Sequence, residues 1–307
     1  IGSHLSERLV RSGRRVIGLD NFADFYPRAA KERNLAAIDA ADAGDTFTFI
    51  EGDIRDAALV GELMASHAPD AIIHIAAMAG VRPSIENPRL YSEVNVDGTV
   101  TLLDAAAGAG VRSFVFASSS SVYGNNDTVP FAETHDVNEP ISPYAATKRA
   151  GELLCHAHWS LHRLPIACLR FFTVYGPRQR PDLAIMKFMR MIAAGEPIPV
   201  FGDGSTSRDY TYIDDIIDGV VAALERADRF RIYNLGGNRP VSLSDLIAAI
   251  ETTMAMPANI RRLPLQPGDV QRTFADLTRS GAELDYHPRT TLEEGLARQW
   301  AWVRGHP

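Results

Sequence analysis

Cysteine is scarce in this sequence. Only two of the 307 residues are cysteines, and Cys155 and Cys168 have neither the spacing of metal ligands nor nearby partners in a Cys/His cluster. This argues against a disulfide-stabilised scaffold, and no metal site is expected. We expect both side chains to be buried thiols in a reducing compartment.

Long apolar runs and an excess of positive charge are also missing. No run approaches the ~20 apolar residues needed to span a bilayer, and no signal peptide is recognisable. The formal net charge of -7 argues against a general nucleic-acid binder, because neutralising phosphates requires a basic face. We therefore expect a cytoplasmic protein with no nucleic-acid or membrane partner. A phosphate-bearing small molecule stays open, since a few local arginines suffice to bind one.

Short β-branched runs alternate with helical patterns through the first two-thirds of the chain. Apolar strands separated by helices are typical of a parallel sheet covered on both faces. Such a doubly wound α/β fold binds its ligand beyond the carboxyl ends of the strands. The predicted strands are 15–20, 47–51, 71–75, 113–118, 165–171 and 231–235, and the main predicted helices of this part are 3–11, 57–65, 94–107 and 143–162.

The pattern changes after Phe172. Residues 173–181 are rich in Gly, Pro and Arg, and the later predicted helices are 184–194, 214–224, 242–254 and 292–303. We expect a Rossmann-type dinucleotide-binding domain made of residues 1–172 and about 208–235. Residues 173–207 and 236–307 are expected to form a smaller α+β substrate domain.

Gly2 and Asp20 have the spacing of a dinucleotide site. Such a site needs a glycine-rich turn between strand and helix, so that the backbone approaches the pyrophosphate at the helix N-terminus. Gly2 matches the last glycine of this turn, so we expect a Rossmann domain that is N-terminally truncated. Asp20 ends the next strand at the ~20-residue spacing at which a carboxylate binds the adenosine ribose. An acid there favours NAD over NADP, because it repels a 2′-phosphate; the alternative is a turn aspartate before Asn21.

Two polar segments follow later strands. Asp53 is placed either to accept from an adenine amino group or to cap the next helix, and its spacing does not decide between the two. Residues 118–121 are four serines at the end of a strand, where hydroxyls would face a ligand. A serine-rich loop is more often only a loop, so this signal is weak by itself.

Tyr144 and Lys148 lie at i and i+4 at the start of a long predicted helix, so they project from the same face. An unperturbed phenol, with a pKa of ~10, is a poor base at neutral pH. A neighbouring ammonium and a positively charged nicotinamide lower the tyrosine pKa toward the working range. Tyr-x-x-x-Lys is common by chance, but the upstream serines and the α/β pattern ending in Asp20 favour a catalytic interpretation.

Together these features resemble the extended short-chain dehydrogenase/reductase family, and within it the NAD-dependent sugar-nucleotide epimerases. The resemblance spans essentially the whole chain. It implies that Ser119, four residues before the tyrosine of Val-Tyr-Gly, is the catalytic serine and that Tyr144 is the acid/base. It also implies that Lys148 binds the nicotinamide ribose, that NAD stays tightly bound, and that the sugar passes through a 4-keto intermediate.

The same resemblance implies which residues surround the two ligands. Phe201 is expected against the uracil, Arg208 at the diphosphate and Asp269 at the nucleotide ribose; a stacking aromatic and an arginine suit a nucleoside diphosphate. The residues expected around NAD are Gly2, Asp20, Asn21, Asp53, Ile54, Ile75, Ala76, Ala77, Asn95, Tyr144, Lys148 and Phe172. The residues expected to bind a UDP-sugar are Ser120, Ser121, Thr173, Arg180, Phe201, Arg208 and Asp269.

Several positions narrow the choice of sugar. Related dehydratases and decarboxylases carry acids just after the catalytic Ser or Thr, where this chain has Ser120 and Ser121. Glucose-type epimerases place Asn at the position of Thr173 and Arg at that of Gln266. The chain is instead similar to UDP-glucuronate 4-epimerases, in which Thr173, the two serines and Arg180 would hold the carboxylate on carbon 5. Fixing that carboxylate out of line with the 4-keto group would prevent loss of carbon dioxide.

Other readings of the same machinery stay open. The first is a UDP-glucose or UDP-N-acetylglucosamine 4-epimerase, and less favoured are a UDP-glucuronate decarboxylase and a sugar-nucleotide dehydratase. A non-catalytic NAD- or nucleotide-binding scaffold is the alternative from another class. The resemblance also implies a homodimer, formed through the predicted helices at 94–107 and 143–162.

Overall fold

The computed structural model describes residues 1–264 and 270–306. By its internal contacts the chain forms two compact units. The first contains Ile1–Gly124, Asp136–Arg170 and Ile217–Tyr233, and the second contains Asn125–His135, Phe171–Ile216 and Asn234–Pro307. The domain limits expected from the sequence concern which ligand each part binds, and they stay a prediction.

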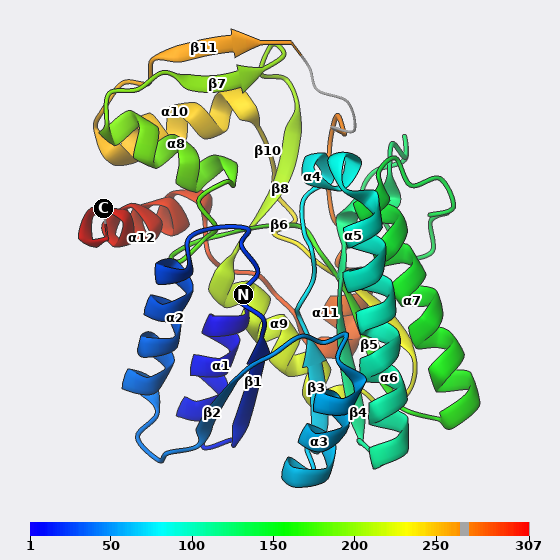
Figure 1. Ribbon diagram of the computed structural model, residues 1–307. Helices are drawn as coiled ribbons and strands as arrows, with labels where there is room; N and C mark the ends of the chain where they lie inside the picture. Colours follow the sequence, from blue (N-terminus) through cyan, green and yellow to red (C-terminus); the bar gives the residue numbers. More distant parts are fainter. Residues whose placement is uncertain (265–269, 307) are drawn as a thin grey trace. The chain divides into compact units, whose positions relative to one another are not determined.

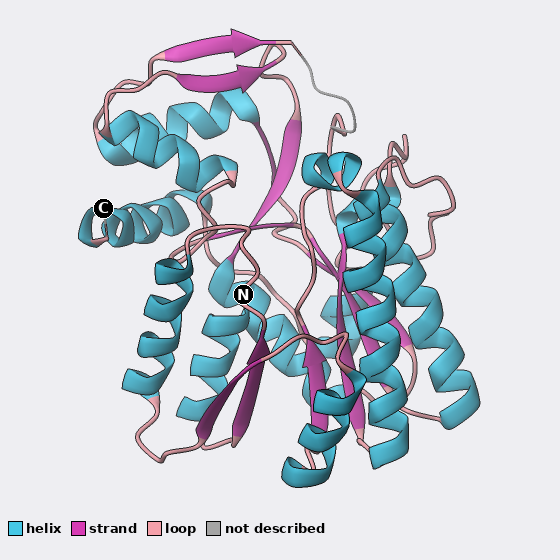
Figure 2. Cartoon of the chain, viewed as in Figure 1, coloured by secondary structure: helices cyan, strands magenta, loops and turns pink. Residues whose placement is uncertain are grey.

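The first unit alternates strands with helices, as Figures 1 and 2 show. Its strands are β1 (Val16–Asp20), β2 (Phe47–Glu51), β3 (Ala71–His74), β4 (Ser113–Ser119), β5 (Ile166–Phe171) and β9 (Arg231–Leu235). Its longer helices are α1 (Gly2–Arg11), α2 (Arg28–Ala41), α3 (Ala57–His67), α6 (Gly98–Ala109), α7 (Pro143–His162) and α9 (Ile213–Arg226). Its short helical segments are α4 (Val81–Glu86), α5 (Pro88–Ser92), the π-helical turn η1 (Glu93–Asp97) and the 3₁₀ turn η2 (Ser120–Tyr123).

The strands of this unit form two sheets. Strands β1 and β2 pair in parallel, with Asp20 opposite Glu51 at their carboxyl ends. The other sheet has the order β3-β4-β5-β9, and β3 pairs with β4 in parallel. Every residue of β4 and β5 is buried, as expected for central strands covered on both faces. The prediction of an α/β fold with parallel strands is therefore confirmed.

The core of the first unit lies between these strands and helices α3, α6 and α7. Phe114 and Phe116 of β4 pack with Leu103 of α6 in a single cluster. Cys155 and Cys168 belong to the same cluster, and both thiols are free and buried, which confirms the prediction of buried thiols. Helices α6 and α7 contact each other (Figure 1).

The second unit combines a mixed sheet with helices. In that sheet β8 pairs with β6 in parallel and with β10 antiparallel, while β7 pairs in parallel with β11. Its strands are β6 (Thr173–Tyr175), β7 (Ile198–Phe201), β8 (Ser207–Tyr212), β10 (Pro240–Ser242) and β11 (Ile260–Leu263), and its helices are α8 (Ala184–Ala193), α10 (Leu243–Met254), α11 (Thr278–Leu284) and α12 (Leu292–Gly305).

Two observations bear on the expectations from composition. In the described ranges, 1–264 and 270–306, no helix combines the length and the apolar character that crossing a membrane requires. In the same ranges, no group of three or more His, Cys, Asp or Glu residues is arranged to hold a metal ion.

Candidate active site

The first turn of α7 places Tyr144 and Lys148. Ser142 caps the helix by accepting a hydrogen bond from the backbone N–H of Ala145 at 3.1 Å, and Pro143 occupies the first helical position, where its missing N–H costs nothing. The helix therefore begins at a defined residue. Tyr144 is its second residue, and Lys148 follows one turn later on the same face.

Lys148 is buried and held to strand β4. Its Nζ donates to the carbonyl oxygen of Ala117 at 2.7 Å and lies 5.1 Å from the ring centroid of Phe116. Burial lowers the pKa of Lys148 to about 8. Helix α7 can pack closely on strand β4 because residue 151 is glycine: a Cβ at Gly151 would collide with the ring of Phe116.

Ser119 is the last residue of β4, and its hydroxyl organises the serines that follow. Its Oγ accepts from the backbone N–H of Ser121 at 3.1 Å and donates to the Oγ of Ser121 at 3.1 Å. These contacts cap the turn η2, which contains Ser120 and Ser121. The predicted catalytic serine and the two predicted substrate serines therefore lie within one turn.

The ring of Tyr144 packs against Tyr91, a residue that the sequence analysis did not identify. The two rings meet edge to face, with centroids 6.3 Å apart and an interplanar angle of 86°. Tyr91 is itself 1% exposed and donates from its hydroxyl to the carbonyl oxygen of Ala79 at 3.0 Å. The position of the catalytic ring is thus supported from a second helix, α5.

Asn95 joins the segment after β3 to helix α7. Its Oδ1 accepts from the N–H of Met78 at 2.8 Å, and its Nδ2 donates to the carbonyl oxygen of Met78 at 2.9 Å and to Thr147 Oγ1 at 3.0 Å. The π-helical turn η1 carries Asn95, and such turns are often found at functional sites. In this structure the amide of Asn95 positions the polypeptide, and contact with NAD remains a prediction.

His74 is the last residue of β3, and Thr99 links it to Asn95. The hydroxyl of Thr99 donates to the carbonyl oxygen of Asn95 at 2.6 Å, so it accepts from Nε2 of His74, 3.0 Å away. Burial, and secondarily the charge of Lys148, lower the pKa of His74 to about 3. His74 is therefore a neutral residue that supports Ile75, Ala76 and Ala77, which follow it at the carboxyl end of the strand.

A buried ion pair lies next to Ser118. Glu152, one turn after Lys148, accepts two hydrogen bonds of 2.8 Å from Arg170 and one of 2.6 Å from the hydroxyl of Ser118. Glu152 and Arg170 are each 1% exposed. The guanidinium of Arg170 also lies 4.7 Å from the ring centroid of Tyr123. Sequence reasoning missed the ion pair, since Glu152 and Arg170 are remote in the chain and neither belongs to a recognisable motif.

The acids expected at the cofactor lie at the carboxyl ends of β1 and β2. Asp53 accepts two hydrogen bonds from the side chain of Arg55 at 2.9 and 2.8 Å and one from Asn21 Nδ2 at 2.8 Å. The Arg55 guanidinium holds the pKa of Asp53 well below its usual range. Ile54 is buried against Gly98, where a Cβ would collide with it. Asn21 and Asp53, both predicted to lie at NAD, are therefore in contact.

A cavity of about 170 Å³ lies next to these residues. Its lining combines polar and apolar groups, as an adenine ring requires. The lining residues are Asn21, Ala23, Asp24, Phe25, Arg55, Met78, Leu90 and Val94. The residues present thus fit the adenosine end of NAD.

Two further predicted cofactor residues have distinct surroundings. Gly2 is the first residue of α1, and a Cβ there would meet nothing within 4 Å. Phe172 is 3% exposed, and its N–H donates to the carbonyl oxygen of Leu235 at 3.0 Å.

The second unit carries most of the predicted substrate residues. Thr173 begins β6 opposite Tyr210 of β8, and Arg208 lies two residues earlier on β8. Phe201 ends β7. Arg208 donates to the carbonyl oxygen of Ser207 at 2.8 Å. Asp269 and Gln266 lie outside the described residues.

Arg180 is paired with a carboxylate. Its Nε and Nη2 donate to the two oxygens of Asp182 at 3.0 and 2.8 Å. The side chain of Arg180 is 24% exposed. This is the bidentate geometry with which arginine binds a carboxylate, and here the partner is a residue of the same chain.

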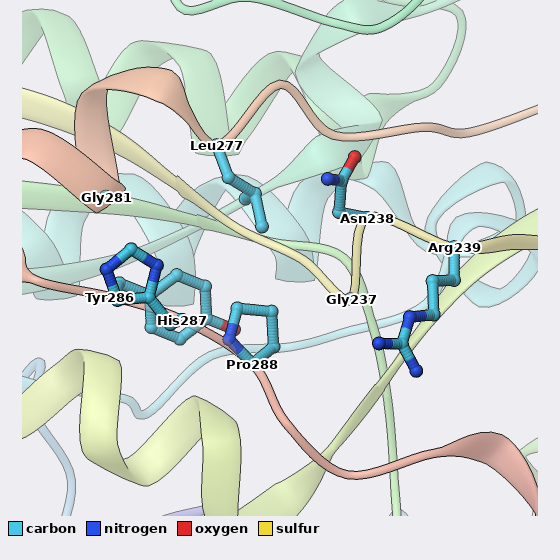
Figure 3. Close-up of a pocket in the computed structure, with 8 residues that line it drawn as sticks. All are labelled: Gly237, Asn238, Arg239, Leu277, Gly281, Tyr286, His287 and Pro288. Atoms are coloured by element: carbon cyan, nitrogen blue, oxygen red, sulfur yellow. The ribbon is translucent and has the colours of Figure 1, made fainter.

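The second unit also has a cavity of about 240 Å³ that contains none of the predicted site residues (Figure 3). It is lined by Gly237, Asn238, Arg239, Leu277, Gly281, Tyr286, His287 and Pro288. Buried Asp209 shapes one wall by accepting from the N–H groups of Gly237 at 2.7 Å and Asn238 at 3.2 Å. Tyr286 donates from its hydroxyl to the carbonyl oxygen of Gly236 at 3.0 Å.

Comparison with known proteins identifies the class. The model of the NAD dependent epimerase/dehydratase family matches residues 1–236. The chain therefore belongs to this family, which confirms the predictions of an enzyme and of NAD as its cofactor.

Individual relatives are similar over nearly the whole chain. A probable UDP-glucuronate 4-epimerase of Rhizobium meliloti is 37% identical, covering 98% of this chain and 93% of that protein. The UDP-glucuronic acid 4-epimerase of Bacillus cereus, in complex with UDP-glucuronic acid and NAD, matches with a TM-score of 0.93 and 35% identity, covering 99% and 96%. The UDP-glucose 4-epimerase of Thermotoga maritima, with UDP-glucose, matches with a TM-score of 0.90 and 29% identity, covering 99% and 95%. The resemblance to sugar-nucleotide epimerases is thereby confirmed.

Proposed function

We propose that this protein interconverts UDP-glucuronate and UDP-galacturonate by NAD-dependent 4-epimerisation. One observation carries the chemistry: Lys148 is buried one turn after Tyr144 and is hydrogen-bonded at 2.7 Å to Ala117, two residues before Ser119. A proton-transferring phenol, an ammonium that stabilises its anion and a hydroxyl to relay the proton are thus supplied by two adjoining elements.

The proposed reaction begins and ends at carbon 4 of the sugar. Tyr144 takes the proton of the 4-hydroxyl, assisted by Ser119, and Lys148 favours the phenolate. NAD supplies the acceptor for the hydride of carbon 4 and later its donor. The resulting 4-keto sugar turns over, and Tyr144 returns the proton to the oxygen as hydride arrives on the other face. The sugar is oxidised and then reduced again, with no net change, so the cycle needs no external reductant.

The proposed cofactor site uses the doubly wound first unit. Asp20 binds the adenosine ribose, Asn21 and Asp53 face the adenine, and Lys148 binds the nicotinamide ribose. Their place at strand carboxyl ends supports this assignment, since such folds bind ligands there. Gly2, Ile54, Ile75, Ala76, Ala77, Asn95 and Phe172 are assigned to the same site.

The proposed contacts with the sugar nucleotide favour a uronate over a neutral sugar. Arg180 and Thr173, with Ser120 and Ser121, bind the carboxylate on carbon 5, while Phe201, Arg208 and Asp269 bind the UDP part. The support is the chemistry of arginine, which binds a carboxylate through two parallel hydrogen bonds, as Arg180 does with Asp182. The absence of an acid at Ser120 and Ser121 disfavours dehydration and decarboxylation. A homodimer and a cytoplasmic location stay predictions from the sequence.

Turnover of separate UDP-sugars by the full-length protein tests the proposal. UDP-glucuronate should give UDP-galacturonate, with no pentose product and no carbon dioxide, and UDP-glucose should react far more slowly. Faster turnover of UDP-glucose would make the protein a glucose-type epimerase, and release of carbon dioxide would make it a decarboxylase. Tyr144→Phe should abolish turnover and leave the melting temperature unchanged; an unaltered rate would overturn the enzymatic assignment.

Arg180 provides the test of sugar selection. Arg180→Lys keeps the charge but loses the two-point geometry, so turnover of UDP-glucuronate should fall while that of UDP-glucose stays the same. Arg180→Ala should also allow loss of carbon dioxide from the 4-keto intermediate. An Arg180→Ala variant that epimerises UDP-glucuronate normally would show that the carboxylate is held elsewhere.

A further inference from the structure

Two cations occupy the first turn of α2, close to the acid proposed to bind the adenosine ribose. Arg28 is the first residue of the helix and Lys31 the fourth, and the first turn contains no acid. A helix N-terminus carries partial positive charge and disfavours cations. Their presence there is therefore not explained by the stability of the helix itself.

Glu51 neutralises Arg28. Nη1 and Nη2 of Arg28 donate to the two oxygens of Glu51 at 2.8 and 2.6 Å, and its Nε donates to Glu32 at 2.9 Å. Glu51 ends β2 directly opposite Asp20, which ends β1. The guanidinium is consequently paired with an acid that neighbours the proposed ribose ligand.

Phe22 holds this arrangement in place. Its ring stacks on Phe49, with centroids 5.2 Å apart, and the guanidinium of Arg28 lies 4.5 Å from the centroid of the Phe22 ring. Phe22 has a φ of 49°, a left-handed conformation that costs a bulky residue energy. Its N–H donates to Oδ1 of Asp20 at 2.7 Å, so the same turn connects the ribose acid with the aromatic ring under Arg28.

Lys31 is occupied as well. Its Nζ donates to the carbonyl oxygen of Ala23 at 2.5 Å and lies 4.9 Å from the ring centroid of Tyr26. Burial lowers the pKa of Lys31, while the charges of Asp20 and Asp24 oppose that shift. Both cations near Asp20 are thus bound within the protein.

An arginine near the end of this strand is what an NADP enzyme uses to accept the 2′-phosphate. We propose that Glu51 is a second determinant of the preference for NAD, acting beside Asp20. By pairing with Arg28 through both of its oxygens, Glu51 withholds the cation that a 2′-phosphate would need. The inference rests on the proposed ribose role of Asp20 and does not depend on the identity of the sugar.

Cofactor binding by the full-length protein, freed of bound nucleotide, tests this role. Dissociation constants for NAD and NADP are measured by calorimetry without a sugar nucleotide, so an incorrect substrate assignment leaves the test intact. Glu51→Gln should lower the dissociation constant for NADP about tenfold, which is the scale of a charge-assisted contact. The dissociation constant for NAD should change by less than about twofold. Asp20→Ser combined with Glu51→Gln should tighten NADP further than either change alone.

Matched variants separate this role from a structural one. Glu32→Gln removes the other acid on Arg28 but leaves the Glu51 pair, so both affinities should stay as in the wild type. Adding Arg28→Ala to Glu51→Gln should cancel the gain in NADP affinity. The proposal is overturned if Glu51→Gln leaves NADP unchanged, if it weakens NAD and NADP equally, or if the gain survives the loss of Arg28. If Asp20→Ser strengthens NADP binding and Glu51→Gln does not, the whole preference for NAD is assigned to Asp20.

Discussion

The Nζ of Lys148 donates a 2.7 Å hydrogen bond to the carbonyl oxygen of Ala117. This bond ties the helix that carries Tyr144 to the strand that ends in Ser119. It also explains how a lysine that is only 4% exposed is accommodated, because a buried ammonium without an acceptor would be far costlier. The bond therefore fixes the start of helix α7 against the end of strand β4.

The buried position of Lys148 predicts a specific dependence of stability on pH. Burial lowers its pKa from 10.5 to about 8 in the folded protein. Between these values the unfolded chain binds more protons than the folded one, so the contribution of Lys148 to the free energy of unfolding becomes more favourable as pH rises. We expect the wild type to gain stability relative to Lys148→Met from pH 8 to pH 10.5, measured by urea unfolding. A constant difference across this range would contradict a depressed pKa.

The Glu152–Arg170 pair predicts a large loss of stability when one partner is removed. Glu152→Gln leaves Arg170 as an uncompensated buried charge, which costs about 3–5 kcal/mol. The denaturant midpoint should fall accordingly. Glu152→Leu combined with Arg170→Met should recover only part of the loss, because Ser118 and Arg149 also lose an acceptor. Glu32→Gln, in an exposed ion pair, is the control and should change stability by less than ~1 kcal/mol. A loss for Glu152→Gln no larger than this control would show that water reaches the pair.

Much of the first unit was predictable because its signals are local. The limits of α7 were predicted as observed, since Ser142 and Pro143 mark its start. Strands at 47–51 and 231–235 also matched, because both contain β-branched or aromatic residues that favour extended backbone. The predicted helix at 94–107 instead begins within the π-helical turn η1, from which Asn95 bonds to Met78 and Thr147.

The parts that escaped prediction depend on contacts between distant residues. Tyr91 meets Tyr144, and Glu152 meets Arg170, only after helices and strands have packed. The strands β6 and β10 have three residues each, too few for an alternating pattern to be recognised. The predicted catalytic spacing could be found from sequence, whereas the residues that support it could not.

Asp209 predicts a stability effect confined to the second unit. Its buried carboxylate accepts from the N–H groups of Gly237, Asn238 and Ala275 at 2.7, 3.2 and 2.9 Å. Asp209→Asn turns a carboxylate oxygen into a donor facing these donors, which should cost about 1–3 kcal/mol. Thermal unfolding should show the loss, and hydrogen exchange should increase at residues 237–239 and 275. Asp245→Asn, at an exposed position of helix α10, is the control. Equal effects of the two changes would contradict a special role for Asp209.

The bidentate pair of Arg180 with Asp182 predicts that the protein's own carboxylate competes with that of the substrate. Both oxygens of Asp182 are bonded to the guanidinium, so a uronate must displace them before it can bind Arg180 in the same way. Asp182→Asn keeps the shape but weakens the pair, since bonds to a charged acceptor are roughly twice as strong as neutral ones. We expect the KM for UDP-glucuronate to fall several-fold with little change in kcat, and the KM for UDP-glucose to stay constant, measured by steady-state kinetics. A rise in the KM for UDP-glucuronate alone would instead mean that Asp182 orients Arg180 for the substrate, and an equal change for both sugars would separate Asp182 from sugar selection altogether.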